Sequence, residues 1–120
     1  MMTQWTVLFD EVFREEFRAF ADAVKEGIEA GVLRLVEEGP NLGRPLVDTL
    51  KGSRHANMKE LRFTADGGVW RVAFAFDPER QAILLVAGDK AGANQKRFYK
   101  VLIAKADERF DAHLAKSRKR

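Results

Sequence analysis

Charged side chains crowd the segment GSRHANMKELRF, residues 52–63, which nevertheless ends like a β-strand. Side chains alternate across a strand, so Glu60 and Arg62 share one face. In the following strand candidate, the same alternation separates Arg71 from its aromatic neighbours, and the turn between the strands brings it near Glu60 and Arg62. Guanidinium groups can bind phosphate oxygens through two parallel hydrogen bonds. Two arginines and one glutamate on a sheet face therefore indicate a possible phosphate site.

A plainer interpretation of the same charges is a solvated outer sheet face. Glu60 could form a cross-strand pair with Arg62 or Arg71 that stabilises the fold by less than ~1 kcal/mol. Patterning alone favours this alternative. In either case we expect Arg71 to stand exposed in a hollow beside Ala73 and Ala75, so that packing does not depend on it.

Other site chemistries find little support in the sequence. The chain has no cysteine, which excludes disulfides, thiolate metal sites and a cysteine nucleophile. His55 lacks a second ligand at metal spacing, and His113 is expected to be structural or solvent-facing. The glycines from Gly88 to Gly92 match neither a P-loop nor a dinucleotide fingerprint. We therefore expect no metal and no cofactor.

The first part of the chain predicts a strand and a helical hairpin. Residues 5–9 are β-branched and aromatic, and Asp10 is a plausible N-cap. Apolar residues from Phe13 to Leu35 then recur at helical spacing. A single helix of that length would overhang so small a domain, so we expect a break between Phe20 and Gly31.

The second part predicts three strands and a final helix. The strand candidates are residues 57–64, 69–76 and 81–87, and the helix runs from about Asn94 to Ala115. The order β-α-α-β-β-β-α gives an α+β fold. Residues 1–115 are expected to form one domain, and residues 116–120 a basic, disordered tail.

The composition agrees with one compact domain of 120 residues, 46% of them hydrophobic. No secretory signal and no membrane-spanning run is visible, so we expect a cytoplasmic protein. The net charge is only +3, but acids dominate before Gly39 and bases dominate from Arg44 to Arg62. This asymmetry predicts one basic face and a polyanionic partner.

Three stretches resemble HigB-like members of the RelE superfamily, which are toxins of type II toxin–antitoxin systems in the phage-derived branch. The stretches are GPNLGRPLVDTLKGSRHANMKELRF, WRVAFAFDPERQAILLVAGDK and FYKVLIAKADERFDAHL. The resemblance covers about residues 5–114. It implies a helical hairpin and a last helix packed on a small, mostly antiparallel sheet.

The resemblance also implies a ribosome-dependent endoribonuclease that cleaves mRNA through 2′-hydroxyl attack without a metal. The matching positions imply five catalytic residues, Glu60, Arg62, Arg71, Lys90 and Tyr99, and we expect four further RNA contacts, Arg54, Lys59, Lys96 and Arg97. The implied partners are mRNA on the ribosome and a HigA-like helix-turn-helix antitoxin, with no membrane.

Two questions stay open on the sequence. Gly88-Asp89-Lys90 replaces the His-Tyr or Lys-Lys pair common in the family, so neither the general acid nor the general base is assigned; the base could be Glu60, Tyr99 or Lys90. The alternative function is a non-catalytic interaction protein on the same fold, either a ParE-type gyrase inhibitor or a degenerate toxin.

Overall fold

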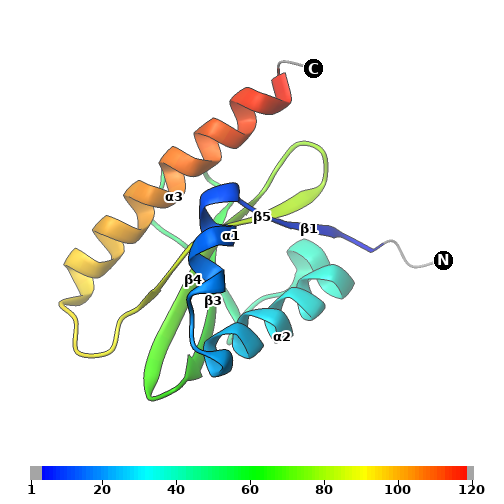
Figure 1. Ribbon diagram of the computed structural model, residues 1–120. Coiled ribbons are helices and arrows are strands. Elements are labelled where there is room, and N and C mark those ends of the chain that lie inside the picture. Colours follow the sequence, from blue (N-terminus) through cyan, green and yellow to red (C-terminus); the bar gives the residue numbers. More distant parts are fainter. Residues whose placement is uncertain (1–3, 119–120) are drawn as a thin grey trace.

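The computed structural model describes residues 4–118 (Figure 1). Five strands and three α-helices, with one 3₁₀ turn, follow in the order β1 (Thr6–Phe9), α1 (Glu11–Arg18), α2 (Asp22–Glu38), the 3₁₀ turn (Gly39–Asn41), β2 (Val47–Thr49), β3 (Met58–Ala65), β4 (Gly68–Phe76), β5 (Gln81–Asp89) and α3 (Gln95–Arg118). Within this part of the chain, no helix is long and apolar enough to cross a membrane.

The five strands form one sheet in the order β1-β5-β4-β3-β2. β1 runs parallel to β5, and the other neighbours are antiparallel. A two-residue turn joins β3 to β4, with Asp66 at φ 53° and Gly67 at φ 76°. Positive φ at both positions matches the twist of a hairpin, as the Asp-Gly pair predicts. This register places Arg62 opposite Arg71.

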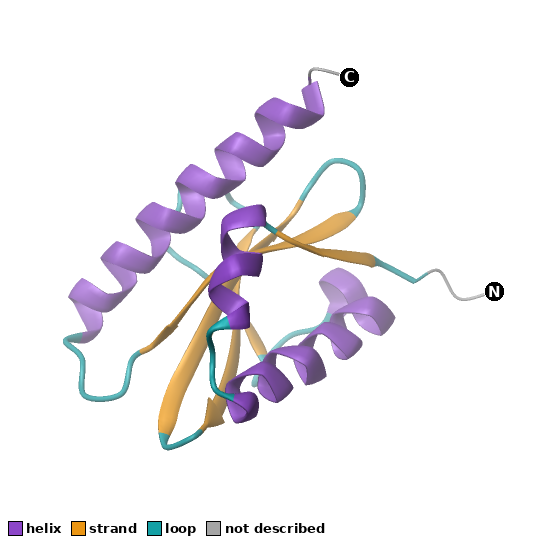
Figure 2. Ribbon diagram, in the orientation of Figure 1, coloured by secondary structure: helices purple, strands orange, loops and turns teal. Residues whose placement is uncertain are grey.

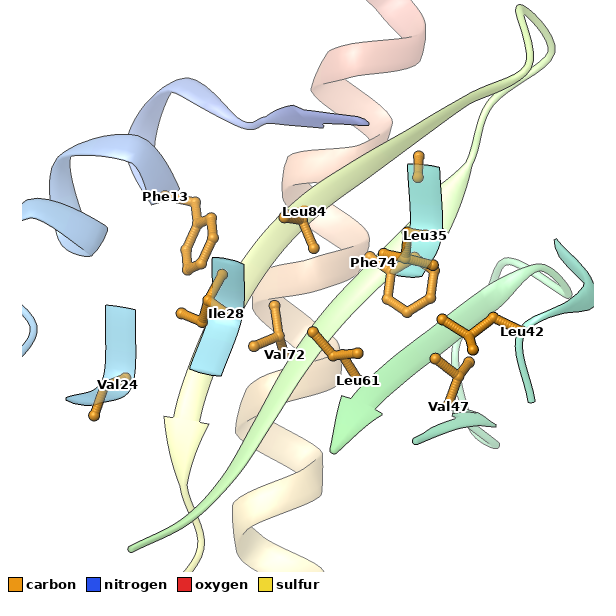
Figure 3. Close-up of a cluster of buried hydrophobic side chains, with 11 residues drawn as sticks. Phe13, Val24, Ile28, Leu35, Leu42, Val47, Leu61, Val72, Phe74 and Leu84 are labelled. Atoms are coloured by element: carbon orange, nitrogen blue, oxygen red, sulfur yellow. The ribbon is translucent and has the colours of Figure 1, made fainter. Parts of the chain in front are cut away.

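Helices cover both faces of the sheet (Figure 2). On one face, α1 and α2 enclose a core that includes Phe13, Ile28, Leu61 and Phe74 (Figure 3). On the other face, α3 packs its apolar stripe onto the sheet through Leu102, Ala106 and Phe110. The α+β fold class predicted from the sequence is confirmed.

Small residues on the α3 face explain an error in the sequence-based prediction. Ala73 and Ala75 are fully buried. They do not leave an open hollow around Arg71 but let α3 lie close to the sheet. Arg71 is consequently buried, with a relative exposure of 6%, and the expectation that it stands on a solvent-facing surface is wrong.

The helical hairpin forms as predicted, with its break close to the early limit of the expected range. Asp10 caps α1 by accepting hydrogen bonds from the backbone amides of Val12 and Phe13, both at 3.1 Å. The chain leaves α1 after Arg18 and enters α2 at Asp22. The long apolar period is therefore shared by two helices that pack on the same side of the sheet.

Three boundaries differ from the sequence-based expectations. Val47–Thr49 adds an edge strand to a segment expected to be a connection. β5 continues through Asp89, so Gly88 and Asp89 belong to the strand. The helix α3 continues through Arg118, so residues 116–118 are helical and not a disordered tail, while residues 119–120 lie outside the described residues.

Candidate active site

A hollow of about 470 Å³ lies beside the first turns of α3, where the helix begins to cover the sheet. Four of the five predicted catalytic residues line it. Glu60 and Arg62 come from β3, Lys90 follows β5, and Tyr99 belongs to α3. Three separate segments thus bring these side chains together.

The fifth predicted residue, Arg71, lies beside this set in an ion pair with Glu60. Its Nε atom is 3.6 Å from Glu60 Oε1, and the two side chains are only 7% and 8% exposed. Arg71 Nη1 also donates a hydrogen bond to the carbonyl of Trp70 at 2.9 Å. The Arg71 guanidinium is therefore bound within the protein and does not line the hollow.

The hydroxyl of Tyr99 links the two charged groups. It accepts a hydrogen bond from Arg71 Nε at 3.2 Å and donates one to Glu60 Oε1 at 2.8 Å. Burial raises the pKa of the phenol, and the hydrogen bond to Glu60 raises it further, while Arg71 acts in the opposite direction. Tyr99 therefore stays protonated and points its proton at the carboxylate.

Lys90 lies over the Tyr99 ring. Its Nζ atom is 5.7 Å from the ring centroid, a cation–π distance. Its backbone amide donates to the Val69 carbonyl at 2.8 Å, which fixes the start of the loop after β5. The neighbouring Asp89 accepts hydrogen bonds from the backbone amides of Val69 and Ala91 at 2.9 Å. Its charge is thus engaged by backbone amides of β4 and of the loop after β5, and Asp89 does not line this hollow.

Two cations of the hollow were missed at the sequence level. Arg44 and Lys51 line it from the segment around β2, together with Asp48, which lies 3.8 Å from Arg44 Nε. The run of basic residues from Arg44 to Arg62 could have pointed to Arg44 and Lys51. The sequence does not predict, however, that the two ends of this run lie together in the fold. With them, the lining contains four cationic side chains, Arg44, Lys51, Arg62 and Lys90, against two carboxylates, Asp48 and Glu60.

The four side chains predicted as further RNA contacts do not line this hollow. Lys59 points to the opposite sheet face, which it shares with Leu61. Arg54 pairs with Asp111, twelve residues after Tyr99 on α3, which is roughly 18 Å along the helix axis. Lys96 and Arg97 are exposed in the first turn of α3, and Arg97 borders a separate hollow between α3 and β5.

The two histidines occupy structural positions at the far end of α3. His55 hydrogen-bonds Asp111, and His113 hydrogen-bonds Asp77, each at 2.8 Å. Both interactions tie α3 to loops at one end of the strands, where His55 precedes β3 and Asp77 follows β4. Within residues 4–118, no group of three or more histidine, aspartate or glutamate side chains is placed to hold a metal ion.

Comparison with known proteins places the whole arrangement in one family. The family described as phage-derived protein Gp49-like matches residues 15–111. The chain is 48% identical over 110 residues to a Mycobacterium tuberculosis protein named as toxin HigB3, covering 91% of this chain and 92% of that protein. It is 55% identical over 91 residues to one named as toxin HigB2, covering 75% of this chain but only 45% of that longer relative.

A solved structure supports the fold independently of close sequence similarity. A mutant of the Escherichia coli toxin RelE in the free state superposes with a TM-score of 0.61 at 14% sequence identity. The match covers 85% of this chain and 96% of the other.

Proposed function

This chain belongs to the Gp49-like family as a HigB-like member of the RelE superfamily, and we propose that it is a toxin that cleaves mRNA on the ribosome. The observation that carries the proposal is the hollow beside Tyr99, whose lining holds four cations together with Glu60 and Tyr99, which are joined by a hydrogen bond. Such a lining suits the backbone of a single RNA strand, and the Glu60–Tyr99 pair offers acid–base chemistry.

Metal-independent cleavage requires the 2′-hydroxyl to attack the adjacent phosphate. The phosphorane that forms has more negative charge than the substrate, and fixed cations near it lower the barrier. Arg62 and Lys90 are the candidates for this role, because Lys90 lies over the Tyr99 ring and Arg62 shares its strand face with Glu60. Arg44 and Lys51 sit on the β2 side, where they would hold flanking phosphates.

The ribosome would supply the positioning that this site lacks. The hollow is open and its acid–base groups are few, so a free RNA strand would seldom align its 2′-hydroxyl for attack. We therefore expect slow cleavage of naked RNA and fast cleavage of mRNA bound to ribosomes. Activity should be unchanged by EDTA. This assignment implies a cytoplasmic protein.

The experiment is inducible expression combined with mapping of new RNA 5′ ends. Arg62→Ala and Lys90→Ala should remove the new ends and the growth arrest, since loss of one transition-state donor costs roughly 10²–10³ in rate. Lys25→Ala, on α2 at the opposite face of the sheet, is the matched control and should behave like the wild type. Growth arrest without any new 5′ ends would favour the non-catalytic alternative, such as gyrase inhibition.

A toxin of this kind needs a neutralising partner. We propose a HigA-like helix-turn-helix antitoxin, because the similarity to toxins named HigB implies a cognate antitoxin. Co-expression should suppress the growth arrest, and the two chains should co-purify as a stable complex. A neighbouring gene product that neither binds nor protects would refute this part while leaving the cleavage proposal intact.

A further inference from the structure

Glu60 lines the hollow but has little exposed surface with which to touch an RNA substrate directly. Its side chain is 8% exposed, and the oxygen nearest to Arg71 also accepts the hydrogen bond from Tyr99. This carboxylate oxygen is therefore already engaged by Arg71 and by the Tyr99 phenol. Tyr99 lines the hollow as well, is less buried than Glu60, and has a hydroxyl that accepts a hydrogen bond from Arg71 and donates one to Glu60.

We infer that Tyr99 relays a proton from the RNA 2′-hydroxyl to Glu60, and that Arg71 is a positioning residue that holds this pair. The inference rests on the proposed ribonuclease activity and assigns the base that the sequence left open. Tyr99 is the catalytic residue in contact with the substrate. Glu60 is the final proton acceptor, and Arg71 acts through both of them.

The step balances without a further reactant. The 2′-oxygen forms its bond to phosphorus while its proton passes to the Tyr99 oxygen, and the original phenol proton passes to Glu60. The bond from phosphorus to the 5′-oxygen breaks, and that oxygen takes a proton from the Lys90 ammonium. A 2′,3′-cyclic phosphate and a free 5′-hydroxyl result, after which Glu60 loses its proton to solvent and Lys90 regains one.

The raised pKa of the Tyr99 phenol favours a proton relay and argues against a deprotonated tyrosine that acts as the base. A phenol whose pKa is raised by burial and by Glu60 holds almost no negative charge at neutral pH. It can accept a proton only while giving one away. The 2.8 Å hydrogen bond to Glu60 provides the path for that transfer.

Arg71 fits a positioning role better than phosphate binding. Its Nε–H points at the Tyr99 oxygen, and one Nη–H is used by the Trp70 carbonyl. The other charged groups around the phenol come from β3, from the loop after β5 and from the segment around β2, and they are Glu60, Arg62, Lys90, Arg44, Asp48 and Lys51. Of these, only Glu60 is hydrogen-bonded to the phenol.

The hydrogen bond can be tested without any activity, because Tyr99 is the only tyrosine of the chain. Ultraviolet absorbance during an alkaline titration then reports one phenol. Glu60→Gln should lower the pKa of that phenol, since the charge and the strong acceptor that oppose ionisation are removed. Tyr99→Phe should abolish the transition. An unchanged phenol pKa in Glu60→Gln would overturn the pairing on which the relay depends.

Cleavage of ribosome-bound mRNA tests the relay itself. Tyr99→Phe and Glu60→Gln should each lower the single-turnover rate by roughly 10²–10⁴, and the double variant should lose no more than either alone. Arg71→Lys should slow the reaction, because a lysine cannot reproduce both hydrogen bonds.

The outcomes separate the inference from the proposed function. If Tyr99→Phe cleaves like the wild type while Glu60→Gln does not, Glu60 acts directly and the relay is wrong. If the wild type itself cuts no RNA, the proposed function fails, and the phenol titration still decides whether Glu60 and Tyr99 are coupled.

Discussion

Arg71 and Glu60 form a buried ion pair in which each charge depends on the other. The two side chains are 7% and 8% exposed, so water does little to solvate either one. Removing one partner from such a pair leaves an unpaired buried charge, whereas replacing both with apolar groups is often tolerated. A substitution at either residue can therefore change both the stability of the fold and the activity of the site.

Truncation of Arg71 should be strongly destabilising. Arg71→Ala leaves Glu60 without its ionic partner and removes the donor to Tyr99, so we expect a loss of about 3–5 kcal/mol in the free energy of unfolding. Urea denaturation measures it. Arg62→Ala, a partly exposed neighbour on β3, is the control and should change stability by no more than about 0.5 kcal/mol. Equal stability of the two variants would contradict the buried pair.

Replacing both charges should restore stability without restoring activity. Glu60→Leu combined with Arg71→Met removes the ion pair as a unit, and we expect most of the Arg71→Ala loss to be recovered. The double variant should nevertheless be non-toxic, because the proton acceptor is gone. Thermal melting beside a growth assay gives both answers. A toxic double variant would show that the pair serves folding alone.

At the scale of elements, α3 makes different contacts at its two ends. Near its start it packs Tyr99 against the charged pair, and near its end it is held by carboxylates. Asp107 accepts hydrogen bonds from Ser53 and from the Arg54 amide, and Asp111 pairs with Arg54 and His55. Asp77, at the end of β4, bonds His113. The far half of α3 is thus docked by charge as well as by its apolar stripe.

Acid should weaken this docking. The pKa of Asp111 is lowered by hydrogen bonds from Arg54 and His55, while that of Asp77 is lowered on balance because hydrogen bonds from His113 and Gln81 outweigh the opposing effect of burial. Carboxylates with depressed folded-state pKa values stabilise the fold above their unfolded values and lose this contribution as pH falls through the folded values. Melting temperatures should therefore fall below about pH 4. In Asp77→Asn, the fall with pH should be shallower; an equally steep fall would contradict this origin.

The close approach of α2 to β3 depends on a glycine. A Cβ atom at Gly31 would lie 2.3 Å from Leu61 Cδ2, and Leu61 is fully buried. Gly31→Ala should therefore destabilise by roughly 1–3 kcal/mol from overpacking, offset in part by the helix propensity of alanine. Gly43→Ala is the control, since nothing lies within 4 Å of its added Cβ. Denaturation midpoints of the two variants give the comparison.

At the scale of the whole molecule, the weak net charge conceals a polarised surface. The chain carries only +3 overall, yet the hollow beside Tyr99 gathers four cations. Binding to a single RNA strand should therefore be governed by this local charge. The opposite sheet face is covered by α1 and α2, which enclose the hydrophobic core shown in Figure 3.

Salt dependence should report this polarisation. For single strands, the logarithm of the binding constant falls with the logarithm of salt concentration by roughly 0.7 for each phosphate contacted. Lys51→Ala should reduce the slope by about that amount for a short RNA, measured by fluorescence anisotropy with the inactive Tyr99→Phe chain as background. Lys25→Ala, on α2, should leave the slope unchanged. An equal effect of both variants would mean that RNA does not select the hollow.

The sequence by itself determined the element order apart from the edge strand β2, and it determined the hairpin turn and the strand faces of Glu60, Arg62 and Arg71. These features depend on local periodicity and on turn chemistry, which neighbouring residues specify. The family resemblance added Lys90 and Tyr99. Both were predicted to lie outside the strands, so the alternation of side chains along a strand could not assign them to the site. Arg54 and Lys59, expected from the sequence as further RNA contacts, lie away from the hollow in the structure.

Only the tertiary structure decided which face of the sheet is open. Alternation tells which side chains share a face, but not whether a distant helix covers it. Because α3 packs over Ala73 and Ala75, Glu60 and Arg71 form a buried ion pair beside the helix, although their charges were predicted to be solvated. The same packing brought Tyr99 to within a hydrogen bond of Glu60, across 39 positions of the chain. Long-range contacts of this kind depend on the shape of the whole core, and no short stretch of sequence encodes them.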